Sequence, residues 1–442
     1  MDPKETCKNL EKKRGPTIEA PWKVTGPPGG SRSGEDLSQG GALLVAGSKR
    51  VAVGFPMIIR ALALSVAMFT VAAPALAQDE SYQVFDTRPV ITEGPYLVAT
   101  GETTATIVWL TDTPSHAKVL FGPDGDLSGV AEPQVDGLVP VGTRHVVHLQ
   151  NLSPGTTYDY EAVATRVVKL NAYWPDKGLD VRSGPHSFTT FDRNSPSVSF
   201  SVVTDTHEDV GRINALNEAI DWDSTEFLVH AGDAFHWIGT EEHLFRAWLR
   251  PTLAGLGHNK SLVFLRGNHE TRGPFARQFR DYVPTLEGRF YYARDAGPLH
   301  LIVLDTGEDK PDDTNVYAEL NQTVPYRAAE LAWFQEHVRT TPRVSEAPFR
   351  VILMHQPGWG WLADGPEAWM ETANDAGVDL VISGHRHRFV YTPPGPDVEH
   401  SYHLLVLDQD QVAKVDATTA ELRVVVTGLD GNVVHTLVIP RR

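Results

Sequence analysis

Cysteine is nearly absent from this chain of 442 residues, which contains a single one, Cys7. One cysteine cannot form a disulfide within the chain, nor can it supply the group of thiolates that a structural zinc site needs. A cysteine nucleophile is also excluded, because Cys7 lies in a segment that we expect to be absent from the mature protein. Any metal ion must therefore be bound by His, Asp, Asn or Glu side chains.

The apolar run at residues 61–73 is too short for a membrane-spanning helix, which needs about 20 residues. It follows a short positive segment with Arg60, and it precedes Ala75-x-Ala77 and an acidic stretch. This order predicts a signal peptide at residues 57–77, cleaved near Ala77. No cysteine lies at the cleavage site, so we expect a secreted or periplasmic protein without a stable membrane anchor.

Residues 1–56 are rich in Gly, Pro, Ser and Lys and show no hydrophobic periodicity. Such a composition predicts disorder. A signal peptide normally stands at the start of a chain, so the alternative interpretation is that Met57 is the true first residue and that residues 1–56 are a mis-annotated leader.

Basic residues are in short supply, because the chain has a formal net charge of −17. Residues 1–77 carry a net charge of +4, so residues 78–442 carry −21. A surface this acidic disfavours duplex nucleic acid and anionic membranes, which bind to Lys and Arg. A small phosphate compound remains possible where metal ions reverse the local charge. The oligomeric state is left open by the sequence.

Residues 90–193 contain short segments that alternate polar and apolar residues, separated by turns rich in Gly and Pro. The clearest segments are 104–110, 145–149 and 157–162. This spacing predicts an all-β sandwich of about 100 residues. From residue 197 onward, short apolar runs alternate with predicted helices at 212–222, 241–253 and 326–339. That alternation indicates an α/β domain with a largely buried central sheet, which a β-hairpin near the C-terminus closes.

Five apolar runs of the second region end on residues that bind metals. Because the carboxyl ends of parallel strands share one edge of a sheet, ligands bind at that edge. The nitrogen and oxygen donors suit two ions of Mn, Fe, Zn, Ni or Co, with one shared carboxylate. The extended segment 384–387 is predicted to point both of its histidines to the same side. The strand-end residues are Asp205, His207, Asp233, Asn268, His355, His385 and His387.

Together these motifs resemble those of the calcineurin-like metallophosphoesterase family: Asp-x-His, Gly-Asp, Gly-Asn-His-Glu, a lone His and Gly-His-x-His. The resemblance implies a four-layer α/β (α+β) sandwich over residues 197–442. The segment 152–158 is similar to the end of a fibronectin type III-like domain, which precedes the catalytic domain in purple acid phosphatases. The implied ligands are Asp205, His207, Asp233 and His387 for one metal, and Asp233, Asn268, His355 and His385 for the other.

The resemblance also implies a mechanism in which hydroxide bound by two divalent or mixed-valence metal ions attacks a phosphate mono- or diester. Asp233 bridges the ions, and His269 aligns with the family's proton donor. Glu270 is expected to orient a ligand histidine, and Asp305 to lie just outside the ligands. The candidates for binding phosphate are Arg266, Arg272 and Arg386, and His236 is a further candidate to contact phosphate or to lie just outside the ligands.

One position departs from the purple acid phosphatases, which have a tyrosine three residues after the bridging Asp. Here that position is His236, so a purple ferric colour is not expected. Two rival interpretations stay open: a non-catalytic binding or adhesion protein with a fibronectin-like domain, and a nuclease. The leading prediction is an exported two-metal hydrolase that acts on a small phosphate ester.

Overall fold

The computed structural model describes residues 81–359 and 365–442. The predicted leader at residues 1–56, the signal peptide at 57–77 and the cleavage site near Ala77 all lie outside the described residues. No helix in the described ranges is both long enough and apolar enough to cross a membrane.

The first part of the described chain is built from strands alone, as the alternating pattern predicted. β2 runs through its centre and pairs antiparallel with β1, β3, β4 and β5. The side chains between the strands form one apolar core that contains Trp109 and Tyr160, both fully buried. The bounds are β1 Ile91–Val98, β2 Ala105–Gly122, β3 Gly129–Ala131, β4 Gly142–Leu149, β5 Thr157–Lys169, β6 Asp176–Arg182 and β7 His186–Thr189.

The second part contains two sheets, where the sequence pattern predicted one central sheet. In the first sheet β8, β9 and β10 are parallel, and β17, β18 and β19 continue it antiparallel from β8. The predicted C-terminal hairpin is confirmed as β18 and β19. The bounds are β8 Ser197–Val203, β9 Phe227–His230, β10 Ser261–Phe264, β17 Gln411–Thr418, β18 Glu421–Gly428 and β19 Val433–Pro440.

The second sheet has the order β11-β12-β13-β14-β16-β15, with β12, β13, β14 and β16 parallel. Its inner face packs on the first sheet, so side chains of both sheets form one apolar cluster around Phe200, Phe227 and Leu301. The bounds are β11 Tyr292–Ala296, β12 Leu299–Val303, β13 Phe349–Leu353, β14 Leu380–Ser383, β15 Val390–Thr392 and β16 His403–Val406.

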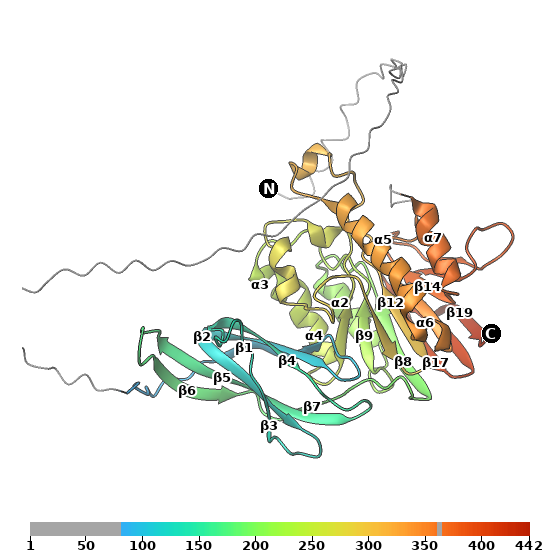
Figure 1. Ribbon diagram of the computed structural model, residues 1–442. Coiled ribbons are helices and arrows are strands. Elements are labelled where there is room, and N and C mark those ends of the chain that lie inside the picture. Colours follow the sequence, from blue (N-terminus) through green and yellow to red (C-terminus); the bar gives the residue numbers. More distant parts are fainter. Residues whose placement is uncertain (1–80, 360–364) are drawn as a thin grey trace, which may run out of the picture. The chain divides into compact units, whose positions relative to one another are not determined.

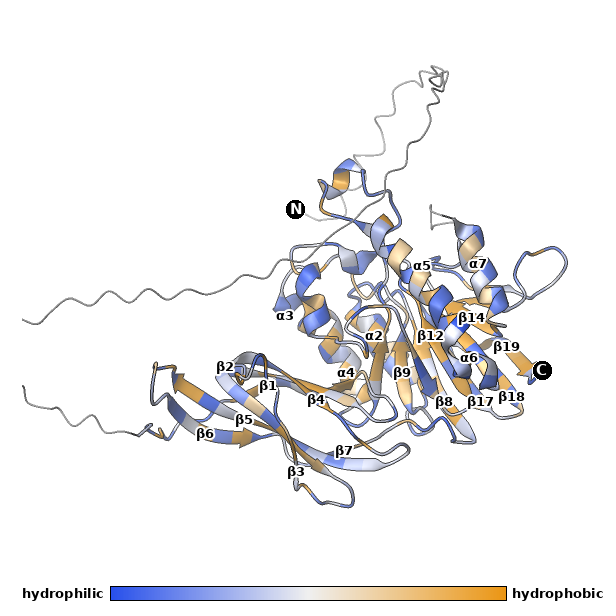
Figure 2. Ribbon diagram, in the orientation of Figure 1, coloured by the Kyte–Doolittle hydropathy of each residue, from blue (hydrophilic) through white to orange (hydrophobic). Residues whose placement is uncertain are grey.

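Helices cover the outer faces of the two sheets, which gives the four layers that the family resemblance implied (Figure 1). Hydrophobic residues run along β9, β12 and β14, whereas the helices also carry hydrophilic residues (Figure 2). Asp209 and Thr240 cap α2 and α3 by accepting hydrogen bonds from the backbone N–H groups of Arg212 and His243. The helices over the first sheet are α2 Val210–Ala219, α3 Glu241–Leu244, the π-helical turn Phe245–Leu249 and α4 Arg250–Leu256, and those over the second are α5 Thr323–Thr340, α6 Pro342–Glu346 and α7 Pro366–Asp375.

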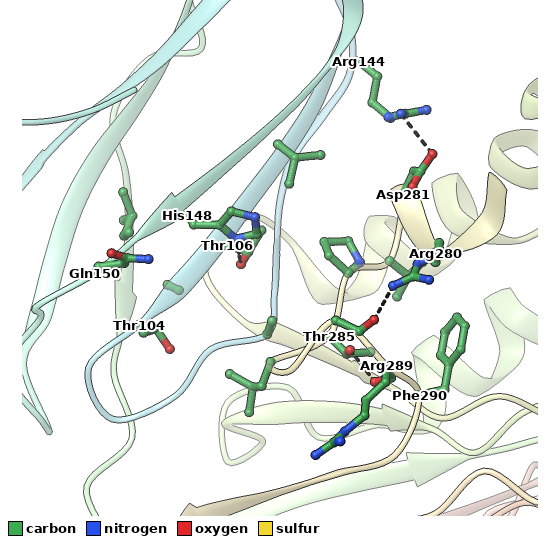
Figure 3. A pocket seen from close by; sticks show the side chains of 18 residues that line it. Thr104, Thr106, Arg144, His148, Gln150, Arg280, Asp281, Thr285, Arg289 and Phe290 are labelled. Atoms are coloured by element: carbon green, nitrogen blue, oxygen red, sulfur yellow. Dashed lines mark hydrogen bonds and ion pairs between the residues drawn. The ribbon is translucent and has the colours of Figure 1, made fainter. Parts of the chain in front are cut away.

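The all-β region is joined to the first sheet by hydrogen bonds between strands. β1 pairs parallel with β10, with Leu97 opposite Ser261 and Val98 opposite Leu262. Near this junction, a cavity of about 550 Å³ lies between β2, β4 and residues 280–290 (Figure 3). Arg144 on one wall of the cavity forms an ion pair of 3.1 Å with Asp281 on the other.

Replacing Phe200 by Ala should lower the free energy of unfolding by about 3–5 kcal/mol, the usual loss for a buried phenylalanine. Phe200 is fully buried between the sheets and stacks on Phe227 with ring centroids 4.6 Å apart. Urea unfolding followed by circular dichroism measures the change. Val438→Ala is the matched control, because Val438 is 43% exposed and should change stability little. A loss for Phe200→Ala as small as that of the control would contradict the two-sheet core.

Candidate metal centre

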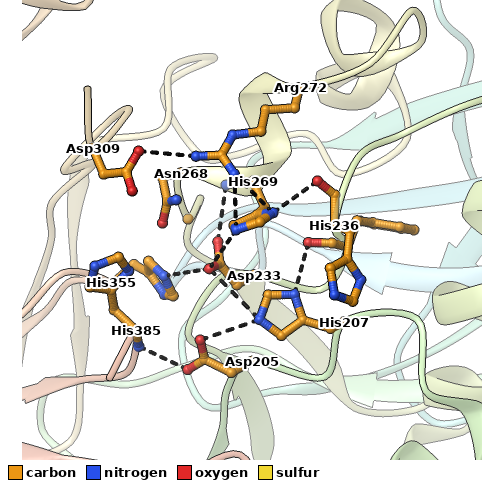
Figure 4. Close-up of polar contacts among 12 residues, drawn as sticks. Asp205, His207, Asp233, His236, Asn268, His269, Arg272, Asp309, His355 and His385 are labelled. Atoms are coloured by element: carbon orange, nitrogen blue, oxygen red, sulfur yellow. Dashed lines mark hydrogen bonds and ion pairs between the residues drawn. The ribbon is translucent and has the colours of Figure 1, made fainter. Parts of the chain in front are cut away.

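The carboxyl ends of strands from both sheets meet at one edge, and the predicted metal-binding side chains converge there (Figure 4). Asp205 and His207 follow β8, and Asp233 follows β9. These three come from the first sheet, while the remaining histidines follow β13 and β14 of the second. Two groups form in which every potential ligand atom lies within 4.8 Å of the others: Asp205 with His207 and His387, and Asp233 with His355 and His385.

The backbone around these residues adopts a left-handed conformation that side chains other than glycine rarely adopt. The angle φ is 53° at Asp205, 52° at Asp233, 73° at His385 and 45° at His387. The prediction of an extended segment at 384–387 is therefore wrong. The two histidines reach different groups because the chain turns at each of them.

Asp205 is fully buried, and its two oxygens have different surroundings. Oδ2 accepts hydrogen bonds from the Thr204 hydroxyl at 2.7 Å and from the backbone N–H of His385 at 2.8 Å. Oδ1 has no hydrogen-bond partner, and it lies 3.1 Å from Nε2 of His387 and 3.8 Å from Nε2 of His207. These contacts fix the carboxylate and leave Oδ1 directed at the two imidazoles.

Asp233 lies between the two groups. Its Oδ2 is 3.0 Å from Nε2 of His355 and 3.9 Å from Nε2 of His207, which belongs to the other group. His355 donates a hydrogen bond from Nδ1 to the carbonyl oxygen of Ala231 at 2.8 Å, so its Nε2 is the nitrogen left to bind a metal. Gly232, with φ of 87°, allows this approach, because a Cβ there would lie 2.7 Å from His355 Nδ1.

Two carboxylates are buried at this edge, and a nearby positive charge is needed to stabilise them. Burial raises the pKa of Asp205 and Asp233, but His355 and the surrounding hydrogen-bond donors outweigh it and leave both pKa values below normal. Burial lowers the pKa of His355, yet Asp233 and Asp205 raise it to about 10. Without a cation from outside, the cluster thus retains a proton to balance its charge.

The potential ligand atoms of the two groups are better suited to bind metal ions than to bond one another. Asp205 Oδ1, Asn268 Oδ1 and His355 Nε2 are buried and form no hydrogen bond with any of the described residues, which is rare for polar atoms in a protein interior. His207 Nε2 and His387 Nε2 are 3.0 Å apart. Imidazole nitrogens and carboxylate oxygens in this arrangement are typical ligands of transition metals. The residues therefore fit a pair of metal ions.

Residues 198–389 match the model of the calcineurin-like phosphoesterase family. They form a calcineurin-like phosphoesterase domain. The chain is therefore a metal-dependent phosphoester hydrolase. The family resemblance inferred from the five motifs is confirmed. A comparison with curated proteins finds no match to the chain.

Two solved structures resemble most of the chain in fold. The purple acid phosphatase PPD1 from seeds of yellow lupin (Lupinus luteus) has 16% sequence identity and a TM-score of 0.56, over 80% of this chain and 74% of that one. PhoD has 10% identity and a TM-score of 0.53, over 78% of this chain and 88% of that one. At such low identity the two structures support the fold alone. The fibronectin type III-like nature of residues 90–193 stays a prediction.

His269 lies at the edge of the phosphoesterase domain's two groups, with Nε2 3.9 Å from Oδ2 of Asp233. Its Nδ1 donates to the carbonyl oxygen of His236 at 2.8 Å, which leaves Nε2 as an acceptor in the neutral ring. Nη1 of Arg272 lies 3.0 Å from that Nε2. Arg272 also bonds Glu308, with Nε 2.8 Å from Oε2, and Nη2 is 3.0 Å from Asp309 Oδ1.

Glu270 is fully enclosed and acts on the backbone beside Asp233, whereas we had expected it to orient a histidine. Its oxygens accept hydrogen bonds from four backbone N–H groups. Burial and Asp233 raise the pKa of Glu270 to about 8, while His355 and these donors act against the increase. All four donors point at the carboxyl oxygens, so these hydrogen bonds stabilise the ionised form and oppose the effect of burial. The donors are Gly267 at 2.7 Å, Ala234 at 2.8 Å, Asp233 at 3.0 Å and Phe235 at 3.3 Å.

The other predicted neighbours lie further from the ligands. Arg266 pairs with Asp305 at 2.6 Å, and its guanidinium stacks on Phe290. Asp305 also accepts a hydrogen bond from the Tyr326 hydroxyl at 2.9 Å, so both side chains are bonded to residues other than the predicted ligands. Arg386 is exposed on the turn between the two histidines.

Some residues that shape the site carry no signal in the sequence. Thr204 precedes Asp205 and bonds its carboxylate, but a threonine at a strand end is common. Glu308 is buried and pairs with Arg272 through a contact between residues 36 positions apart. Such a distant pair has no local pattern that could have revealed it.

Replacing Glu270 by Ala should weaken both the fold and the binding of metal. Buried N–H groups without acceptors destabilise by about 1–3 kcal/mol each. Because the displaced loop carries Asp233, metal affinity should also fall by about 10- to 100-fold. Calorimetric titration with Mn or Zn and urea unfolding in chelator measure the two effects. Glu218→Ala, a change at an exposed helix residue, is the control, and equal behaviour of the two variants would contradict the assignment.

The iron-loaded protein should lack a purple absorption band, because His236 stands where a tyrosinate would be needed. The His236 side chain is 58% exposed, and its Nδ1 lies 3.1 Å from Glu208 Oε2. A visible absorption spectrum of the protein reloaded with ferric iron tests this prediction. Protein reloaded with zinc provides the baseline. A strong band for iron alone would show that a phenolate from another tyrosine reaches the metal.

Proposed function

We propose that the protein is an exported phosphoesterase that uses two metal ions to hydrolyse small phosphate mono- or diesters. The observation that carries the proposal is the position of Asp233 between two groups of ligands, each with a buried donor atom that forms no hydrogen bond within the described residues. Export rests on the signal-peptide pattern at residues 57–77. The net charge of −17 supports a small ester over duplex nucleic acid.

We infer that the residues divide between two ions in the way that the family resemblance implies. Once bound, two transition-metal ions lower the pKa of water and offset the negative charge on phosphoryl oxygens. Mn, Fe, Zn, Ni and Co all suit these donors. Asp205, His207, Asp233 and His387 would hold one ion, and Asp233, Asn268, His355 and His385 the other.

We assign to His269 the transfer of a proton to the leaving group. Burial lowers its pKa, and although Asp233 acts in the opposite direction, the net shift is downward. The ring is therefore neutral near pH 7 before substrate binds. An anionic phosphate beside the ring raises the pKa of the imidazole. His269 then takes up a proton from solvent on Nε2 and donates it to the leaving-group oxygen.

Hydrolysis of p-nitrophenyl phosphate and bis(p-nitrophenyl) phosphate tests the proposal. The protein spanning residues 78–442 is stripped of metal and reloaded with Mn, Fe, Zn, Ni or Co. We expect turnover that requires metal, at least 100-fold lower in Asp233→Asn and about 100- to 10,000-fold lower in His269→Ala. The preferred ester decides between phosphatase and phosphodiesterase.

Asp397→Asn is the matched control for Asp233→Asn, because Asp397 is an exposed carboxylate remote in sequence from the ligands. Equal activity of both variants would remove Asp233 from the mechanism. If no metal supports turnover despite full occupancy, the proposal fails and a binding role gains support. Cleavage of nucleic acid with neither ester hydrolysed would favour a nuclease.

A further inference from the structure

Arg272 lies between His269 at the metal centre and a neighbouring cavity. One nitrogen of its guanidinium contacts His269, as described above, and Arg272 also lines a cavity of about 570 Å³. A phosphate ester whose leaving group points toward His269 would extend the rest of that group past Arg272. The cavity is therefore the space that the leaving group would occupy.

Part of this cavity is apolar. Val316 and Leu320 line it, and their side chains are 70% and 68% exposed. The chain turns sharply between them, because Ala318 and Glu319 have φ of 48° and 63°. Exposed aliphatic side chains beside a catalytic site favour a substrate with a hydrocarbon segment.

A second cavity, of about 320 Å³, adjoins the first and shares Thr271, Arg277, Leu320 and Asn321 with it. Arg277 and Arg280 both line this second cavity, three residues apart on the 3₁₀ helix Ala276–Asp281. A 3₁₀ helix has three residues per turn, so both arginines lie on the same side, about 6 Å apart along the axis.

The charge of these two arginines is not balanced by a carboxylate. Arg277 donates to the carbonyl oxygen of Leu320 at 3.1 Å, and Arg280 donates to that of Gly288. Neither forms an ion pair with any carboxylate of the described residues. The other arginines and the lysine that line the two cavities are paired: Arg272 with Glu308 and Asp309, Lys310 with Asp309, Arg266 with Asp305, and Arg289 with Glu287.

Within the described residues, Arg277 and Arg280 thus lie close together without an acidic partner, although the chain has a net charge of −17. Arg280 also borders the 550 Å³ cavity, where Arg144 is paired with Asp281 (Figure 3). Among the arginines and lysines of the described chain that line the 570 and 320 Å³ cavities, Arg277 and Arg280 are therefore the two without an ion pair, and Arg277 shares the first cavity with Arg272. Guanidinium groups held by carbonyl oxygens keep other donors available for a phosphate or carboxylate.

We propose that Arg277 and Arg280 bind a second anionic group of the substrate, carried on the leaving group and separated from the scissile phosphate by an apolar spacer. This inference rests on the proposed phosphoesterase function. It defines the substrate class as phosphate esters with an anionic tail, and it excludes a preference for simple alkyl esters.

The test compares two series of esters with the metal-loaded protein. One series consists of ω-phosphonoalkyl phosphates with chains of increasing length, and the other of alkyl phosphates of the same lengths. The phosphonate cannot be hydrolysed, so each compound has one scissile ester. The ratio of kcat/KM between matched members measures the second site and does not depend on the fraction of active protein.

We expect wild type to favour the phosphonate series, with an optimum chain length, and the Arg277→Gln/Arg280→Gln variant to lower the ratio by about tenfold or more. Added salt should lower the wild-type ratio as well. Arg423→Gln is the matched control, because Arg423 is an exposed arginine on β18 and should leave the ratio unchanged.

The outcomes separate the two proposals. If wild type hydrolyses p-nitrophenyl esters but shows no preference for the phosphonate series, the second site is overturned and the phosphoesterase function stands. A preference that persists in the double variant also overturns the assignment to Arg277 and Arg280. If wild type hydrolyses no ester with any metal, the function itself fails.

Discussion

The placement of two carboxylates, Asp205 and Asp233, in the interior is the constraint on which the structure around the site depends. A buried carboxylate is stable only with hydrogen bonds or a nearby cation. The chain supplies part of this through Thr204 and through the backbone N–H groups of His385 and His269. The carboxylate oxygens and imidazole nitrogens that these bonds do not use are the atoms that would bind metal ions. The left-handed turns and the buried Glu270 hold this arrangement in place.

The positions of the ligands were predictable because each follows an apolar strand, and strands and their ends leave a local pattern. The division of those strands between two sheets was not predictable from the pattern alone. A buried parallel strand such as β9 has the same composition as β13, whichever sheet it joins. The four layers were anticipated only through the family resemblance.

The neighbours of the ligands were harder to predict than the ligands. Glu270 next to His269 was expected to contact a histidine, but its carboxylate turns inward to the backbone of residues 233–235. Arg266 was a candidate for phosphate, but Asp305 holds it through a contact that spans 39 positions. Side-chain direction depends on such distant partners, and a single sequence does not reveal them. For the same reason, a single sequence does not reveal that Arg277 and Arg280 lack ion pairs within the described residues. That result requires the partner of every nearby carboxylate to be known.

The pairing of β1 with β10 has a consequence for how the protein can be divided. If residues 197–442 were separated from the region before them, β10 would become the edge of its sheet. The backbone groups of β10 that pair with β1, at Ser261 and Leu262, would then lose their partners, while the pairing of β10 with β9 would remain. Exposed edges of this kind invite other chains to add to the sheet and lead to aggregation. The all-β region thus covers one edge of strand β10 in the first sheet of the phosphoesterase domain.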